Sequence, residues 1–288
     1  MSATGELNAA NREALALPTY ETLTLALDAG VAMVCLNRPD KANSMNGPMW
    51  NELQACFEWI DSEPTARVAI LAGNGKHFCA GIDLSLFANI VPGQGSRKEP
   101  GRQAEAMRRT ILRLQENLSA IEKCRKPVLA AIHYTCIGGG VDLTSCCDMR
   151  YCTEDAYFSI KEIEIGMVAD VGTLQRLPRL IGDGMVRELA YTGRKLEAGE
   201  AKQLGFVNRV YPDRAALLRG VSEIARDIAA KSPLAVRGTK EMILYGRDHT
   251  VADGLNYIAT WNAGMLSQQD LMGSVEAQGR GEVIDYED

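Results

Sequence analysis

Three carboxylates in apolar surroundings are the residues of this chain best suited to chemistry. Asp142, Glu162 and Asp170 follow one another at spacings of 20 and 8 residues. An aspartate in an apolar stretch, as Asp170 is between Ala169 and Val171, costs free energy unless it is paired or used. Carboxylates whose surroundings separate their pKa values can act as an acid and a base. The group could therefore transfer protons.

Two of these carboxylates also have a purely structural interpretation. Asp170 is placed to cap the N-terminus of a helix that begins at Val171. The alternation of apolar and charged residues over 160–165 would put Glu162 and Glu164 together on the solvent face of a strand. The residues alone leave both interpretations open.

Two glycine-containing turns could supply hydrogen-bond donors to the same site. The segment HFCAGIDL (77–84) follows a strand-like run, and CIGGGVDL (136–143) lies between a strand and a helix. Each turn leaves backbone N–H groups unpaired, and two such groups brought together could hold a developing oxyanion. The structural alternative is a turn glycine at Gly81 and close helix–strand packing at the triple glycine. A phosphate-binding loop is a poor alternative because no Lys-Ser/Thr follows the glycines.

Strands and helices alternate in the elements that must position these groups. Runs at 22–27 and 31–36 flank an Asp-Ala-Gly turn and predict a hairpin. Asn46 is placed to cap a helix that ends near residue 61. Further strands are expected at 68–72, 127–132 and 149–153, and further helices at 102–121 and 139–145. This succession predicts an α/β fold of repeated ββα units rather than a doubly wound sheet.

The later part of the chain is mostly helical. Helices are expected at 171–177, 184–192, 198–204, 213–230, 233–245 and 250–265, with one strand at 207–211. We therefore divide the chain into an N-terminal arm (1–20), an α/β core (21–195) and a helical C-terminal region (196–288). The segment 88–101, rich in glycine and proline, is expected to be a loop, either a lid over the site or a simple surface loop.

Composition and charge exclude several classes of function. The chain has 46% hydrophobic and 24% charged residues, as soluble globular proteins do, and its net charge of −6 argues against a nucleic-acid binder. No run approaches the ~18 to 20 apolar residues of a membrane span. The first 20 residues lack the apolar core of a signal peptide and are not typical of a transit peptide, and the last residues are not a peroxisomal address.

The cysteines indicate an intracellular protein with reduced thiols. Eight cysteines are scattered along the chain with no CxxC pair, and the three histidines are not spaced with them as zinc ligands are. Disulfide frameworks belong to oxidising compartments. No metal site is expected.

In this order, the residues resemble the crotonase (enoyl-CoA hydratase/isomerase) superfamily over roughly residues 22–280. The resemblance rests on AGIDL (80–84), GGG (138–140), DMRY (148–151), TLQRLP (173–178) and KQLGFV (202–207). It implies a crotonase-like spiral of ββα units with a helical C-terminal trimerisation region. It also implies enolate chemistry on an acyl-CoA thioester and a homotrimer or a homohexamer of two trimers. No separate cofactor is implied, since coenzyme A is part of the substrate.

The resemblance also assigns roles to single residues. The N–H groups of Ile82 and Gly139 would form the oxyanion hole. The thioester and pantetheine would be bound by Gly139 and by the whole turn, which comprises Ala80, Gly81, Ile82, Asp83 and Leu84. Lys41 and Lys240 are candidates for contacts with the CoA phosphates, and the alternative for each is a solvated surface lysine.

The carboxylates indicate one branch of the superfamily. Hydratases carry glutamate at the positions of Asp142 and Glu162, and typically glycine at that of Asp170. The three acidic residues here are similar to those of the dienoyl-CoA isomerase branch, which converts 3,5-dienoyl-CoA to 2,4-dienoyl-CoA in fatty-acid β-oxidation. This implies that Glu162 and Asp170 move a proton from C2 to C6 while Asp142 orients them. Which of the two takes the C2 proton stays open.

Other readings of the resemblance remain. The enzyme alternatives are an enoyl-CoA hydratase and a Δ3,Δ2-enoyl-CoA isomerase, and the non-enzyme alternative is an inactive crotonase-fold scaffold. Members of the branch often end with a peroxisomal address, which this chain lacks. We expect a soluble protein of the mitochondrial or peroxisomal matrix if the source is eukaryotic, and of the cytoplasm otherwise.

Overall fold

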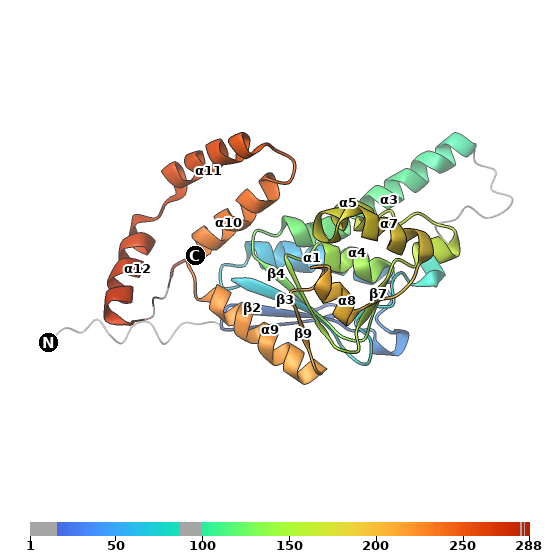
Figure 1. Cartoon of the computed structure of the whole chain (residues 1–288), viewed down its shortest axis with the longest axis horizontal. Helices are drawn as coiled ribbons and strands as arrows, with labels where there is room; N and C mark the ends of the chain where they lie inside the picture. The colour runs from blue at the N-terminus through green and yellow to red at the C-terminus, as the bar shows by residue number, and fades with distance from the viewer. Residues whose placement is uncertain (1–15, 87–98, 283, 285) are drawn as a thin grey trace.

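A six-stranded sheet lies at the centre of the computed structural model, which describes residues 16–86, 99–282, 284 and 286–288 (Figure 1). The strand order is β1-β2-β3-β4-β6-β9. β1 and β2 form the expected antiparallel hairpin, and every later pair is parallel. The strands are β1 (Leu23–Asp28), β2 (Val31–Leu36), β3 (Val68–Gly73), β4 (Val128–Ile132), β6 (Met149–Thr153) and β9 (Arg209–Tyr211).

A second, three-stranded sheet continues from the first. It consists of β5 (Thr135–Ile137), β7 (Tyr157–Ser159) and β8 (Leu196–Glu197). The chain passes from β4 to β5 through Tyr134, whose φ of 52° turns the backbone between the sheets. Each of β4 and β6 is thus followed by a short strand of the other sheet and then by a helical turn, which is the repeated ββα pattern expected from the sequence.

Helices cover both faces of the large sheet. On β3, Ala69 and Leu71 pack into the core that includes α1 (Gly47–Ser62) and α3 (Pro100–Lys123). Val68 and Ile70 point to the opposite face, which α9 (Arg214–Ala229) covers. Alternate residues of a strand face opposite sides, so β3 and β4, covered on both sides, are buried throughout.

Shorter helices connect the two sheets, and longer ones extend from them. The connecting helices are α4 (Gly139–Ser145), α5 (Thr173–Arg176), α6 (Pro178–Ile181), α7 (Asp183–Thr192) and α8 (Ala198–Gln203). The last three helices that the structure describes are α10 (Pro233–Tyr245), α11 (Val251–Met265) and α12 (Gln268–Arg280), and Figure 1 shows α11 and α12 standing away from the sheet. Neither α11 nor α12 has a buried residue.

Three sequence-based expectations for local structure are wrong. Residues 160–165 contain a 3-10 helix, η3 (Glu162–Ile165), instead of a strand. The helix expected from Val171 begins at Thr173 behind Gly172, so Asp170 is not its cap. α12, β5, β7 and β8 were not expected at all.

Some expectations fall outside what the structure tests. Residues 1–15 of the expected arm and residues 88–98 of the expected loop lie outside the described residues, and residues 100 and 101 belong to α3. The division at residue 195 stays a prediction, although β9 and α9 lie beyond it and complete the large sheet and its cover.

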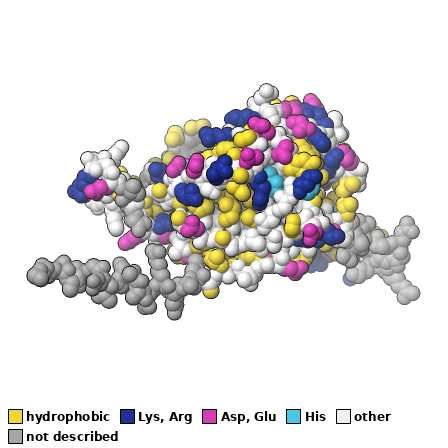
Figure 2. Space-filling model, turned by 90° about the horizontal axis from the view of Figure 1, so that it is seen from below, with side chains coloured by type: hydrophobic (Ala, Val, Ile, Leu, Met, Phe, Trp, Pro, Cys, Tyr) yellow, Lys and Arg dark blue, Asp and Glu magenta, His cyan; other side chains and the backbone are white. Residues whose placement is uncertain are grey.

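Charged and apolar side chains mix on the surface (Figure 2), and the cysteines are free thiols. On the face shown in Figure 2, basic and acidic side chains are interspersed with apolar ones. All eight cysteines are unpaired, and all but Cys35 are buried. In the ranges that the structure describes, no helix combines the length and the apolar character needed to cross a membrane.

Candidate active site

One cavity of about 190 Å³ brings the three carboxylates and both glycine turns together. Asp142, Glu162 and Asp170 line it, and so do Ile82 and Gly139. Most of the remaining wall is apolar and comes from α1, α3 and the segment before α5: Trp50, Met107, Ile111, Leu114, Ile165, Met167 and Val171. The residues that the sequence singled out for acid–base and oxyanion chemistry therefore share one apolar site.

The two turns present unpaired N–H groups side by side. Met45 donates its N–H to the Gly81 carbonyl (2.8 Å) and accepts the Asp83 N–H (3.0 Å), which leaves the Ile82 N–H pointing away from Met45. Gly139 is the first residue of α4, where helical N–H groups lack an acceptor. A Cβ on Gly139 would lie 3.6 Å from the Ile82 nitrogen. Among the described residues, neither N–H has an acceptor, so both are free for an oxyanion.

Glycine is required where the turns meet. Gly81 has a φ of 87°, and a Cβ there would lie 2.9 Å from the Ile137 carbonyl oxygen. A Cβ on Gly139 would lie 2.5 Å from the Met45 Cε. The packing interpretation is also correct at Gly140, where a Cβ would lie 3.1 Å from Cys79. The triple glycine thus serves both the site and the packing of α4.

Asp142 is the most deeply buried of the three carboxylates. Its side chain is fully buried on α4, and its Oδ1 accepts the Thr173 N–H at 2.7 Å. Its Oδ2 has no partner among the described residues. Burial raises the pKa of Asp142 to about 6, and the Thr173 hydrogen bond and the Arg176 charge act in the opposite direction.

Glu162 opens η3 and faces the cavity. Its Oε2 is buried and has no partner in the described part of the chain. Burial, and then the neighbouring charge of Asp142, raise the pKa of Glu162 to about 7. Glu164 instead pairs with Lys161 at the surface (2.5 Å). In a 3-10 helix, with three residues per turn, positions i and i+2 point in different directions, which is why the expected shared solvent face does not form.

Asp170 completes the group from the segment before α5. Burial raises its pKa above the ordinary value. The Gln115 side-chain amide of α3 donates to the Asp170 backbone carbonyl at 2.6 Å and fixes this segment against the cavity wall. The aspartate is therefore held at the site rather than at a helix cap.

The rest of the expected thioester turn lies beside the cavity. The Ala80 N–H donates to the Ala42 carbonyl (2.9 Å). Asp83 accepts from Ser85 and pairs with Arg38 at 2.9 Å, and these contacts hold the pKa of Asp83 below its ordinary value. Leu84 is exposed. Of these residues, Ile82 lines the cavity itself.

The two lysines proposed for the CoA phosphates differ in their surroundings. Lys41 is exposed at the end of a short 3-10 helix, η1 (Pro39–Lys41). Lys240 is buried on α10, where its Nζ pairs with Asp148 (2.8 Å) and donates to the Lys126 carbonyl (3.1 Å). An ammonium group enclosed in this way does not present its charge to a phosphate. The assignment of Lys240 is therefore corrected to a structural ion pair.

Thr173 and Arg176 are site residues that reasoning from the sequence missed. Both lie in the TLQRLP segment, which carried the family resemblance but no assigned role. The fold brings Thr173 into a hydrogen bond with Asp142, 31 residues earlier, and brings the Arg176 charge near the same carboxylate. No spacing rule within the sequence connects them.

Comparison with known proteins decides the family. Residues 26–275 match the family described as "Enoyl-CoA hydratase/isomerase". The chain belongs to this family. The crotonase fold expected from the sequence is thereby confirmed.

Two curated family members are similar over most of the chain. The mitochondrial Δ(3,5)-Δ(2,4)-dienoyl-CoA isomerase of Pongo abelii is 47% identical over 262 residues, which cover 90% of this chain and 79% of the relative. The peroxisomal enzyme of the same name from Arabidopsis thaliana is 46% identical over 267 residues, 92% of this chain and 96% of the relative. These relatives confirm the resemblance to the dienoyl-CoA isomerase branch.

Solved structures of the family have the same fold. The enoyl-CoA hydratase of Bacillus anthracis has a TM-score of 0.84 and 32% identity, covering 93% of this chain and 99% of the other. A Thermobifida fusca family member in complex with acetoacetyl-CoA has a TM-score of 0.76 and 31% identity, covering 85% and 94%.

Proposed function

We propose that this chain isomerises 3,5-dienoyl-CoA to 2,4-dienoyl-CoA in fatty-acid β-oxidation. The observation that carries the proposal is the third carboxylate: Asp170 lines the same apolar cavity as Asp142 and Glu162, and Ile82 and Gly139, with their free N–H groups, line it too. The relatives of nearly half-identical sequence bear the name of this reaction. The Thermobifida fusca structure holds an acyl-CoA on the same fold, which supports an acyl-CoA substrate.

The oxyanion hole supplies the stabilisation that enolate formation requires. The thioester carbonyl oxygen lies between the N–H groups of Ile82 and Gly139 and gains negative charge as C2 loses its proton. Donors aimed at that oxygen act most strongly in the transition state, and loss of one such donor typically costs about 3 to 4 kcal/mol.

Glu162 takes the C2 proton in this proposal. Its Oε1 would lie 3.3 Å from a Cβ on Gly138, the residue before the Gly139 donor, so Glu162 is next to the oxyanion hole. C2 is bonded to the thioester carbon and must lie there too. Its C–H electron pair forms C2=C3, and the former C3=C4 pair becomes C4=C5. The former C5=C6 pair bonds a proton from Asp170 at C6, so no oxidant or reductant is needed.

Asp142 lies in the wall of the same cavity and changes the pKa of its neighbour Glu162. Its negative charge helps to raise the pKa of Glu162 and makes that carboxylate a stronger base. Asp142 itself is held by Thr173 and does not need to exchange a proton with the substrate.

The test is to incubate the protein with 3,5-dienoyl-CoA and follow the absorbance of the conjugated 2,4-dienoyl product. The proposal predicts formation of this chromophore. Hydration of a 2-enoyl-CoA without the chromophore would instead establish a hydratase, and conversion of 3-enoyl-CoA to 2-enoyl-CoA alone would establish a Δ3,Δ2-enoyl-CoA isomerase. Binding of CoA esters without any turnover would establish an inactive scaffold.

The assembly and the compartment belong to the same proposal. We propose a homotrimer or a homohexamer of two trimers, supported by large apolar side chains exposed along α11 and α12, among them Val251, Leu255, Leu271, Met272 and Val275. The two relatives are named as mitochondrial and peroxisomal. We propose the same matrix compartments for this chain in a eukaryotic cell, and the cytoplasm otherwise; cell fractionation tests this.

A further inference from the structure

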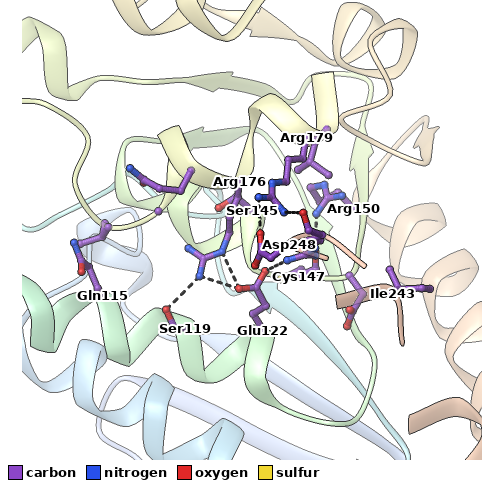
Figure 3. A pocket seen from close by; sticks show the side chains of 16 residues that line it. Gln115, Ser119, Glu122, Ser145, Cys147, Arg150, Arg176, Arg179, Ile243 and Asp248 are labelled. Atoms are coloured by element: carbon purple, nitrogen blue, oxygen red, sulfur yellow. Dashed lines mark hydrogen bonds and ion pairs between the residues drawn. The ribbon is translucent and has the colours of Figure 1, made fainter. Parts of the chain in front are cut away.

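A second cavity, of about 690 Å³, is lined by residues of α3, α5 and the turn after α10, and charged side chains in its wall form a chain of ion pairs (Figure 3). Arg176 on α5 donates to the Glu122 carboxylate of α3 from Nη2 (3.1 Å) and Nε (3.2 Å). Its Nη2 also donates to the Ser119 hydroxyl at 3.2 Å. Arg247, just after α10, contacts the other Glu122 oxygen. Glu122 therefore joins α5 to the first of the C-terminal helices.

Two of the three side chains in this ion-pair chain are largely shielded from water, and Arg247 lies at its exposed end. The Arg176 and Glu122 side chains are 16% and 21% exposed. Burial opposes ionisation of Glu122, yet the hydrogen bonds and charges of Arg176 and Arg247 hold its pKa below the ordinary value. Removing one partner from such a group leaves an uncompensated charge, so the three side chains depend on one another.

Arg176 also determines where the backbone next to Asp142 lies. It is three residues after Thr173, whose N–H donates to Asp142. Its Nη1 would lie only 1.9 Å from a Cβ on Gly172, so the guanidinium lies directly against the residue that precedes Thr173. Holding Arg176 therefore holds both ends of the turn that supplies the Asp142 hydrogen bond.

We propose that Arg176 is a positioning residue for Asp142, and that Arg247 keeps it in place through Glu122. The proposal rests on the role given to Asp142 in the proposed function. It makes the turn between α10 and α11, which lies outside the catalytic cavity, a determinant of the geometry of the deepest carboxylate.

The pKa of Asp142 depends on the charged groups that surround it. Glu162 and Asp170 face it from the cavity, and Arg176 acts on it from α5. The neighbouring Cys79 and Cys146 are buried, and burial raises the pKa of both thiols, so they are uncharged at neutral pH. Among the groups that the structure describes around Asp142, Arg176 is thus the positive charge that opposes two carboxylates.

The experiment measures the protonation of Asp142 by infrared spectroscopy during a pH titration. The Asp142 band is identified as the protonated carboxyl signal that Asp142→Asn removes. With Arg176→Met, the midpoint should rise by about one pH unit, because a nearby positive charge is lost. With Arg247→Met, the midpoint should rise by less, and Arg176→Lys should restore part of the shift. Isomerase kcat should fall in the two methionine variants with little change in KM.

Asp248→Asn is the matched control. It removes the neighbouring, exposed Arg179–Asp248 pair (2.8 Å) on the same turn, and it should leave the midpoint unchanged. An unchanged midpoint in folded Arg176→Met, or an equal shift in Asp248→Asn, would overturn the proposal. If Arg176→Met does not fold, an unchanged midpoint in Arg247→Met overturns the proposal that Arg247 holds Arg176 in place through Glu122. The infrared measurement needs no turnover, so it is decisive even if the isomerase assay fails.

Discussion

Two glutamates in η3 show how local geometry separates the proposed base from a surface residue. Glu162 and Glu164 have the same side chain and similar sequence surroundings, yet one lines the cavity and the other pairs with Lys161 at the surface. Burial without a partner for Oε2 is costly to the fold, and such a cost is typical of a group retained for its reactivity.

The pH dependence of kcat/KM should report the carboxylate group. Because Glu162 must be ionised as the base and Asp170 must be protonated as the acid, the profile should be bell-shaped, and the limb set by Glu162 should lie at about 7, where its pKa lies. Asp142→Asn removes a negative charge that raises this pKa, so the limb near 7 should move to lower pH. The apparent values belong to the coupled group. A limb that stays in place in Asp142→Asn would contradict the electrostatic role of Asp142.

The same carboxylate should lower the stability of the fold at high pH. The folded-state pKa of Glu162 is raised to about 7 from 4.5, so the folded protein binds the extra proton between these values. Stability contributed by this proton is present at low pH and is lost as pH rises through 7. Glu162→Gln should therefore stabilise the protein against urea by about 2 kcal/mol more at pH 8 than at pH 5. Equal effects at both pH values would contradict the shift.

Single elements differ in how far the sequence predicts them. The boundaries of α10 and α4 agree with the expected ones, because Pro233 and Gly139 mark the helix starts clearly. η3 was misjudged because its four residues of alternating polarity suit a strand as well as a 3-10 helix. α12 was missed because its apolar residues, such as Leu271 and Val275, are exposed and are interrupted by glycine, so they do not form the apolar stripe of a buried helix.

The site residues, like the helices and strands, could be predicted where a local sequence pattern marks them, but not where packing between distant segments decides their contacts. The glycine turns and the carboxylates could be predicted because each is a local pattern that the family resemblance supports. The contacts of Arg176 with Glu122, 54 residues earlier, and of Lys240 with Asp148 depend on packing between distant elements. The burial of Lys240 could not be read from its sequence neighbours.

The ion pair of α10 gives a prediction at this scale. Lys240→Met leaves Asp148 without its cation, so the free energy of unfolding should fall by about 3 kcal/mol or more. The affinity for a CoA ester should not change, as measured by calorimetry on the folded protein. Lys41→Met, at an exposed position, should leave stability unchanged and weaken CoA-ester binding. Weaker binding in Lys240→Met at unchanged stability would restore the original assignment.

In a single chain, an apolar face of α11 is exposed to solvent. Val251, Leu255 and Ile258 follow one another at i, i+4 and i+7 on α11 and form an exposed stripe. Exposed apolar surface of this kind marks an association site. Because trimers of the chain would cover it, the stripe is the feature that the proposed assembly explains.

The assembly predicts the effect of one charge on this stripe. Leu255→Asp should convert the trimer or hexamer to a smaller species in sedimentation velocity, because burying an unpaired carboxylate is unfavourable. Thr260→Asp on the same helix, nine residues after Val251 and so on the opposite face, should leave the assembly intact. Dissociation by both variants, or by neither, would contradict an interface on this stripe.

The most direct test of the account compares three variants in the dienoyl-CoA assay. Glu162→Gln and Asp170→Asn should each lower the rate of 2,4-dienoyl-CoA formation by about 100-fold or more while CoA-ester binding persists. Glu164→Gln, in the same 3-10 helix as Glu162, should be as active as the unchanged protein. Near-normal turnover in Glu162→Gln or Asp170→Asn would show that the carboxylates of this cavity do not carry the reaction.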